Sequence, residues 1–229
     1  MFKKSTKSGV FFAILALSPT LLLAHDVSSG DQQILDNGGL LSYIWVGAKH
    51  MLTGYDHLLF LVGVIFFLKG FRDILKFITV FTLGHSITLL GGTYFGVQVN
   101  EYLIDAIIAL SVFYKGFENL EGFQKLGTKP LNLMFMVFLF GLIHGLGLST
   151  RLQSFDMGQD QFLLKIVSFN IGVELGQITA LIPIIFLINS WRRNGKSNYA
   201  AFYKASNVYL VIAGIGLFAY QMYRFFLNY

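Results

Sequence analysis

Long apolar runs separated by short polar loops are the main pattern along this chain. About 20 apolar residues in helical form are enough to cross the hydrocarbon core of a bilayer. The pattern therefore predicts an all-α fold, a polytopic membrane helix bundle with six transmembrane helices after an N-terminal signal peptide. The predicted spans are residues 43–68, 72–92, 100–118, 131–150, 161–190 and 203–226.

The first predicted span is too long for one helix that stands perpendicular to the membrane. We expect its start to lie along the interface, with Trp45 as an aromatic anchor.

Residues 1–24 are typical of a secretory signal peptide. Lys3, Lys4 and Lys7 precede a short apolar core, and Ala24 ends a plausible cleavage site. The alternative is a first helix that is retained, but the core is short for a span and Pro19 interrupts it. The sequence then predicts a short external segment at 25–40 and a single transmembrane domain at 41–229.

The distribution of cations predicts the orientation in the membrane. One set of span ends is rich in Lys and Arg, whereas the opposite ends carry mainly Asp and Glu. The first set is expected to be cytoplasmic, which places the N- and C-termini on the external side. The cations of that set are Lys69, Arg72, Lys76, Lys115, Lys125, Lys129, Arg192, Arg193, Lys196 and Lys204.

Composition supports a membrane protein and limits its chemistry. The chain is 55% hydrophobic and only 13% charged. The net charge of +5 comes from cations in short loops between apolar runs, so it does not indicate a nucleic-acid partner. Because there is no cysteine, any metal site must use nitrogen and oxygen ligands.

Two imidazoles and a carboxylate lie at the mouth of the first apolar run. His50 and His57 are seven residues apart, which is close to two helical turns, so one continuous helix would present both on the same face. Gly54 lies between them on nearly that face, and Asp56 precedes His57. Ionisable groups are costly in hydrocarbon, so the cluster indicates a function, and metal binding is the first to consider.

Further ionisable residues fall at a similar depth in other spans. At about 1.5 Å per residue, His57, His85 and His144 lie roughly 10 Å below the outer surface. A single histidine in a span is often a packing residue, but several in one layer favour a site. The predicted metal ligands are His50, Asp56, His57, His85, His144 and Glu174, and the predicted supporting residues are Asn170, Gln177, Ser86 and Asp105.

Four segments around these residues resemble the HupE/UreJ family of hydrogenase and urease accessory membrane proteins. They are His50 to His57 with the following Leu-Leu-Phe, Phe81 to Leu89, Phe140 to Gly147, and Phe169 to Gln177. The H-x-x-x-x-x-D-H motif of the family falls on His50, Asp56 and His57. Its later His-Gly motif matches only at His144-Gly145, as expected of a divergent branch.

The resemblance implies a small helical permease for nickel or a related divalent cation. It also implies a location in the bacterial inner membrane and, as partners, the lipid and a metalloenzyme maturation system. From the residues alone, an imidazole and carboxylate set suits Ni²⁺, Co²⁺, Zn²⁺ or Cu²⁺ equally.

Three functions fit this sequence. The leading hypothesis is a transporter or binding protein for a divalent transition metal. The second is an intramembrane zinc-dependent hydrolase that uses the same histidines, with Glu174 or Asp56 as base. It is disfavoured because neither G-x-S-x-G nor H-E-x-x-H occurs. The third is an accessory protein for metalloenzyme maturation, without turnover.

Overall fold

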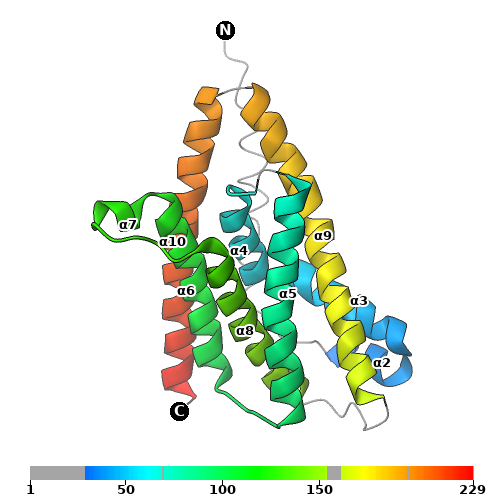
Figure 1. Ribbon diagram of the computed structural model, residues 1–229. Helices are drawn as coiled ribbons and strands as arrows, with labels where there is room; N and C mark the ends of the chain where they lie inside the picture. Colours follow the sequence, from blue (N-terminus) through cyan, green and yellow to red (C-terminus); the bar gives the residue numbers. More distant parts are fainter. Residues whose placement is uncertain (1–28, 69, 154–160, 195, 229) are drawn as a thin grey trace.

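The structure, a computed structural model, describes residues 29–68, 70–153, 161–194 and 196–228. The elements in this part of the chain are all helices (Figure 1). The predicted signal peptide at 1–24 lies outside the described residues. The helices are α2 (Ser29–Asn37), α3 (Leu40–Thr53), α4 (Tyr55–Ile65), α5 (Phe71–Tyr94), α6 (Glu101–Asn119), α7 (Gly122–Lys125), α8 (Leu133–Leu152), α9 (Phe162–Asn194) and α10 (Lys196–Leu227).

Four of the described helices are long and apolar enough to cross a membrane. They are α5, α8, the Phe162–Ser190 part of α9 and the Tyr199–Leu227 part of α10. The prediction of a helical membrane protein is confirmed, and four of the six predicted spans are supported. The third predicted span, α6, is helical but carries four charged residues, namely Glu101, Asp105, Lys115 and Glu118.

The first predicted span is not one helix. Gly54 has φ −68° and ψ 100°, an extended conformation that ends α3 and precedes α4. The expectation that His50 and His57 share the face of a continuous helix was therefore wrong. Because glycine loses more conformational freedom than other residues in a helix, a break at this position costs little.

The helix α4 is short and lies inside the bundle (Figure 1). It has 11 residues, and Leu59, Phe60, Leu61, Val62, Val64 and Ile65 are all buried. A helix that is apolar on every side suits the inside of a bundle, and one of 11 residues is too short to cross the membrane by itself.

The outer helices pack in close pairs: α5 with α8, α3 with α9, and α6 with α10. Glycines permit this closeness. A Cβ atom on Gly145 of α8 would collide with the carbonyl oxygen of His85 on α5, and one on Gly172 of α9 would collide with that of Ile44 on α3. Small residues at such crossings allow backbones to touch, which is a common way to join helices in a membrane.

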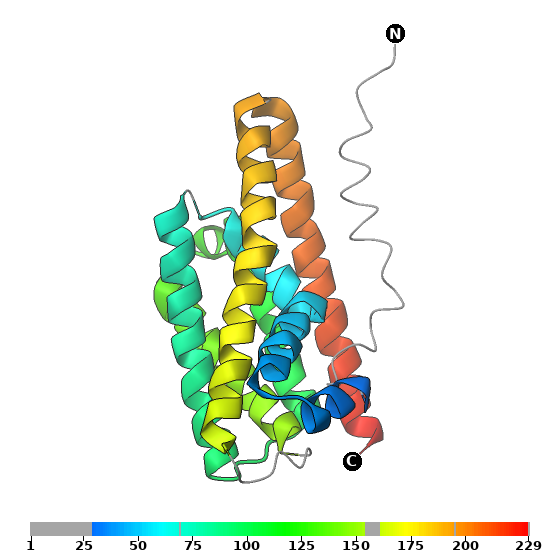
Figure 2. The ribbon, with the colours of Figure 1, turned by 90° about the vertical axis from the view of Figure 1, so that its right-hand side faces the viewer.

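The pair α9 and α10 extends beyond the other helices at one end of the bundle (Figure 2). These helices have 33 and 32 residues. The helices α2 and α3 lie toward the opposite end, where α10 also ends (Figures 1 and 2).

We expect Gly145→Ala to destabilise the protein by about 1–3 kcal/mol, because the added methyl group must separate α8 from the backbone of α5. Thermal unfolding of the detergent-solubilised protein measures the effect. The matched control is Gly216→Ala on α10, where no atom lies within 4 Å of the new methyl group. This control should be neutral or stabilising, because alanine favours a helix over glycine. Equal melting temperatures for the two variants would contradict the packing described here.

Candidate metal centre

Three imidazole rings from distant segments form a continuous chain. His50 lies in the last turn of α3, His57 lies in the first turn of α4, and His144 lies within α8. The ring centroids of His50 and His57 are 5.2 Å apart, and those of His57 and His144 are 4.6 Å apart. His57 and His144 are buried, whereas His50 is half-buried. The rings of His50 and His57 therefore meet even though the helix breaks between them at Gly54.

A fourth imidazole joins this layer from α5. His85 is 1% exposed, and its Nδ1 lies 2.9 Å from Oδ1 of Asn170 on α9. The Phe81 ring connects it to the other rings, because its centroid is 6.0 Å from that of His85 and 5.4 Å from that of His144. The side chains of α3, α4, α5, α8 and α9 thus meet in one region, which we call the histidine layer (His50, His57, His85 and His144).

The hydrogen bond to Asn170 fixes the chemistry of His85. The Asn170 amide nitrogen is 3.4 Å from the carbonyl oxygen of Ile166, so the amide oxygen faces the ring. Because Oδ1 can only accept, Nδ1 of His85 must donate its proton. The Nε2 atom then carries the lone pair, which is the form in which an imidazole binds a metal.

Phenylalanine rings adjoin the histidine layer. The Phe60 ring contacts those of Phe77, Phe81 and Phe140, with centroid distances of 5.1–6.4 Å, and it also contacts His144 at 6.3 Å. These apolar rings exclude water from one side of the imidazoles. Charge on an ion or a side chain in this region is therefore weakly screened.

The remaining predicted residues differ in burial and in their hydrogen bonds. The side chain of Asp56 lies outside the described residues. Glu174 and Ser86 are half-buried, and no hydrogen bond or ion pair joins Glu174 to the described imidazoles. Gln177 is fully buried, and neither atom of its amide has a hydrogen-bond partner within the described part of the protein. An amide in this state can accept a ligand without losing an existing bond.

Asp105 has a different partner from the one expected. Its Oδ2 accepts a hydrogen bond from the Arg151 guanidinium at 2.7 Å, and both side chains are buried. Gln221 of α10 lies 3.4 Å from the same oxygen. The geometry makes Asp105 part of an ion pair that joins α6 to α8. The sequence contained a sign of this ion pair, because Arg151 is one of the few cations at the acidic ends of the spans.

The histidine layer is not arranged as a closed metal site. Among the described residues, no three His, Asp or Glu side chains stand where they could hold one metal ion together. The rings of His57 and His144 pack edge to face, with an angle of 90° between their planes. Binding of one ion by both needs a nitrogen lone pair of each ring to point at that ion.

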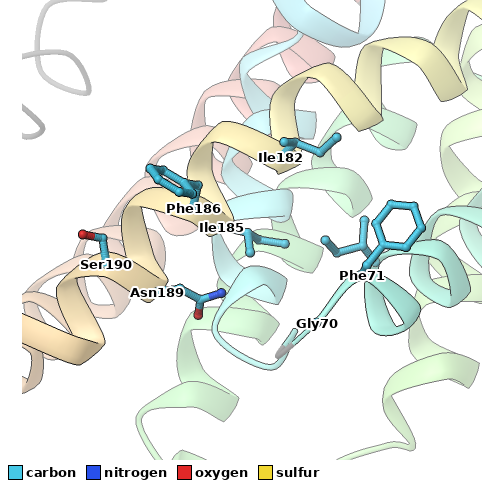
Figure 3. A pocket seen from close by; sticks show the side chains of 8 residues that line it. Gly70, Phe71, Ile182, Ile185, Phe186, Asn189 and Ser190 are labelled. Atoms are coloured by element: carbon cyan, nitrogen blue, oxygen red, sulfur yellow. The ribbon is translucent and has the colours of Figure 1, made fainter.

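A groove at the start of α5 offers no such ligands. It has a volume of about 650 Å³ and lies between the start of α5 and the later part of α9 (Figure 3). Its lining is mostly apolar, with Phe71, Ile182 and Phe186 beside Asn189 and Ser190. Without an imidazole or carboxylate, it does not compete with the histidine layer as a place for a metal.

The fold and the layer of buried imidazoles define an all-helical membrane protein with polar chemistry inside its bundle. A family model described as HupE / UreJ protein matches residues 29–229. The chain therefore belongs to the HupE/UreJ family, and the resemblance seen in its motifs is confirmed. Comparisons with curated proteins and with solved structures gave no match.

We expect ¹⁵N NMR of the purified protein to show His85 in the form protonated at Nδ1, because Asn170 accepts that proton. In Asn170→Leu the resonance should shift toward the Nε2-protonated form, and the stability should fall by about 1–3 kcal/mol because a buried donor loses its partner. The control is Gln33→Leu, an exposed amide on α2. An unchanged His85 spectrum in Asn170→Leu would contradict the assignment.

We expect Arg151→Met to destabilise the protein by about 3–5 kcal/mol, because it leaves the buried Asp105 carboxylate without its cation. The double variant Arg151→Met/Asp105→Asn removes both charges and should recover most of the loss. Thermal unfolding of the wild type and both variants measures this. If the double variant melts as early as the single one, the pair does not account for the stability.

Proposed function

We propose that this protein carries a divalent transition-metal cation, such as Ni²⁺ or Co²⁺, across a membrane. Membership of the HupE/UreJ family supports a role in metal transport or in the supply of metal to a maturing metalloenzyme. In the proposed orientation the cation-rich span ends face the cytoplasm of the bacterial inner membrane, and both termini are external.

One observation carries the proposal most strongly. The rings of His50, His57 and His144 come from three helices, yet they form a continuous contact, in which His57 and His144 are buried. Imidazole is a preferred ligand for nickel, cobalt, zinc and copper ions. His85 supports the same function, because its bond to Asn170 leaves Nε2 as the ligand atom.

The arrangement also fits transport better than permanent storage. A transport site must bind an ion tightly enough to load it and loosely enough to release it. Here no three His, Asp or Glu side chains of the described residues form a closed ligand set, so an ion in the histidine layer would be held loosely. Imidazole binds metal only in its unprotonated form, so affinity should fall as the pH decreases and the rings take up protons.

The remaining predicted residues have clear roles in this proposal. His50 and His57 take the ion near the end of α3, and Asp56, the neighbour of His57 in the sequence, is a further ligand in this proposal. His85, His144 and Glu174 then hold it within the bundle. Gln177 and Ser86 offer further oxygen atoms, and Asn170 orients His85. Asp105 supports the site only indirectly, because it holds α6 against α8 through Arg151.

We expect His57→Ala and His144→Ala each to lower nickel uptake into proteoliposomes by about tenfold or more, because each removes a ligand of a shared ion. The matched control is Asp73→Asn at the start of α5, which removes an ionisable group far along the helix from His85. Metal content of the purified proteins, measured by mass spectrometry, should fall in parallel. Uptake at the wild-type rate in both histidine variants would contradict the proposal, and so would bound metal without uptake by the wild type.

A further inference from the structure

A second buried polar cluster lies at the other end of α4 from His57. It contains side chains from α6 and α10 around the last turn of α4. Its members are Lys115, Glu118 and Asn119 of α6, Tyr203 and Asn207 of α10, and the carbonyl oxygen of Gly63. His57 and Gly63 are six residues apart, so the cluster is about 9 Å further along α4 than the histidine layer.

The most unusual feature of this cluster is a buried ion pair. Lys115 is 0% exposed, and its Nζ lies 2.7 Å from Oε2 of Glu118. The ammonium also lies over the Phe67 ring, 3.7 Å from its centroid. The sequence pattern had placed Lys115 among the cations at the ends of the spans. A buried ion pair generally costs about as much in desolvation as it gains in attraction, so stability alone is a weak reason for it.

The neutral members of the cluster have a structural explanation. The Phe67 amide bonds to the carbonyl of Val64, so the Gly63 carbonyl lacks the usual partner from the next turn. The Asn119 amide donates to that carbonyl at 2.9 Å, and also to Oδ1 of Asn207 at 2.6 Å. These hydrogen bonds supply a partner for a carbonyl group at the end of a buried helix, where no water is present to bond it. They do not require a charged pair beside it.

The surroundings of Glu118 favour a cation. The carboxyl-terminal end of α4 carries the partial negative charge of the helix dipole. Two cations already lie at this end. Lys115 lies over the Phe67 ring, and Arg192 of α9 donates to the carbonyl of Phe66 at 2.8 Å. The Oδ1 atom of Asn119 is buried and has no hydrogen-bond partner in the described structure. Glu118 and Asn119 together thus offer a carboxylate and an amide oxygen near a negative helix end.

We propose that Glu118 and Asn119 form a second site for the transported cation, and that the Lys115 ammonium occupies this site when no ion is present. The inference rests on the proposed transport function. When a metal ion arrives, the hydrogen bond from Nζ to Oε2 breaks and a metal–oxygen bond forms. Lys115 keeps its proton and moves its long side chain toward water, as lysines near helix ends commonly do. When the ion leaves, the ammonium returns.

Oxygen ligands suit a release site. Late transition metals bind imidazole more strongly than carboxylate and amide oxygen, so the ion is held more weakly here than in the histidine layer. The tethered ammonium competes for the same carboxylate and lowers the affinity further. The Glu118 site thus lies about 9 Å beyond the tighter histidine layer and binds the ion more weakly. An ion that reaches it can be released instead of remaining inside the bundle.

The decisive experiment is nickel uptake by the double variant Lys115→Met/Glu118→Gln in proteoliposomes. The variant removes both charges, so it leaves no unpaired buried ion and should fold. We expect uptake to fall about tenfold or more, while nickel bound by the histidine layer of the solubilised protein stays unchanged. The matched control is Glu121→Gln, an exposed carboxylate three residues after Glu118. If the folded double variant takes up nickel at the wild-type rate, the pair is structural and the inference is wrong.

A binding measurement tests the site directly. In His57→Ala/Lys115→Met the histidine layer is weakened and the competing ammonium is absent, so calorimetry with nickel should detect a site that the single variant His57→Ala lacks. Adding Glu118→Gln should abolish this nickel binding.

A second variant covers the case in which Lys115→Met prevents folding. Glu118→Asp keeps the ion pair but shortens the ligand, and it should raise the KM for nickel uptake. An unchanged KM would overturn the inference. Failure of wild-type uptake would instead overturn the proposed function, so the two failures are distinguishable.

Discussion

A short helix buried at both ends imposes the main constraint on this structure. The α4 helix has 11 residues, whereas crossing a bilayer takes about 20. Its terminal amide and carbonyl groups therefore lie inside the bundle, where an unsatisfied polar group is costly. The protein meets this demand with polar side chains from neighbouring helices. Asn119 and Arg192 bond to the carbonyls at one end, and the histidine layer lies at the other.

The close helix pairs determine where the imidazole rings lie around α4. Because glycines let α5 touch α8 and α3 touch α9, the rings on these helices are held within contact distance of α4. Thr88 adds a hydrogen bond of 2.7 Å to the carbonyl of Leu142, which fixes α5 along α8 beside His85. The relative placement of the backbones that carry the imidazoles thus depends on close contact between the helices.

The sequence predicted the helices well because long apolar runs in a membrane protein have few alternatives to a helix. The predicted span at 72–92 corresponds to α5 (Phe71–Tyr94), and that at 131–150 to α8 (Leu133–Leu152). The meeting of His57 with His144 could be anticipated from depth alone, because rise per residue places both near one level. Depth does not say which way a side chain turns, so the edge-to-face packing of the rings was not predictable.

The errors came from features that depend on tertiary partners. The length of the run at 43–68 indicated that it is not one perpendicular helix, but it did not indicate a break at Gly54, which follows from the burial of α4. Asp105 was predicted to support a metal site, because its partner Arg151 is 46 residues away in the chain. Lys115 was counted as a span-end cation, yet it is 0% exposed. In each case the residue type indicated a special position, but the role of the residue depended on the neighbouring side chains and helices in the fold.

The lengths of α9 and α10 set how the protein protrudes from its membrane. A helix of 33 residues is about 50 Å long, while the hydrocarbon core is about 30 Å thick. Tilt alone does not remove the excess, because it would need an angle above the usual limit of about 40°. The excess must therefore lie outside the hydrocarbon core, in the headgroup layer and the water beyond it. At this end α9 and α10 continue past their neighbours, so they leave the apolar part of the membrane as regular helices.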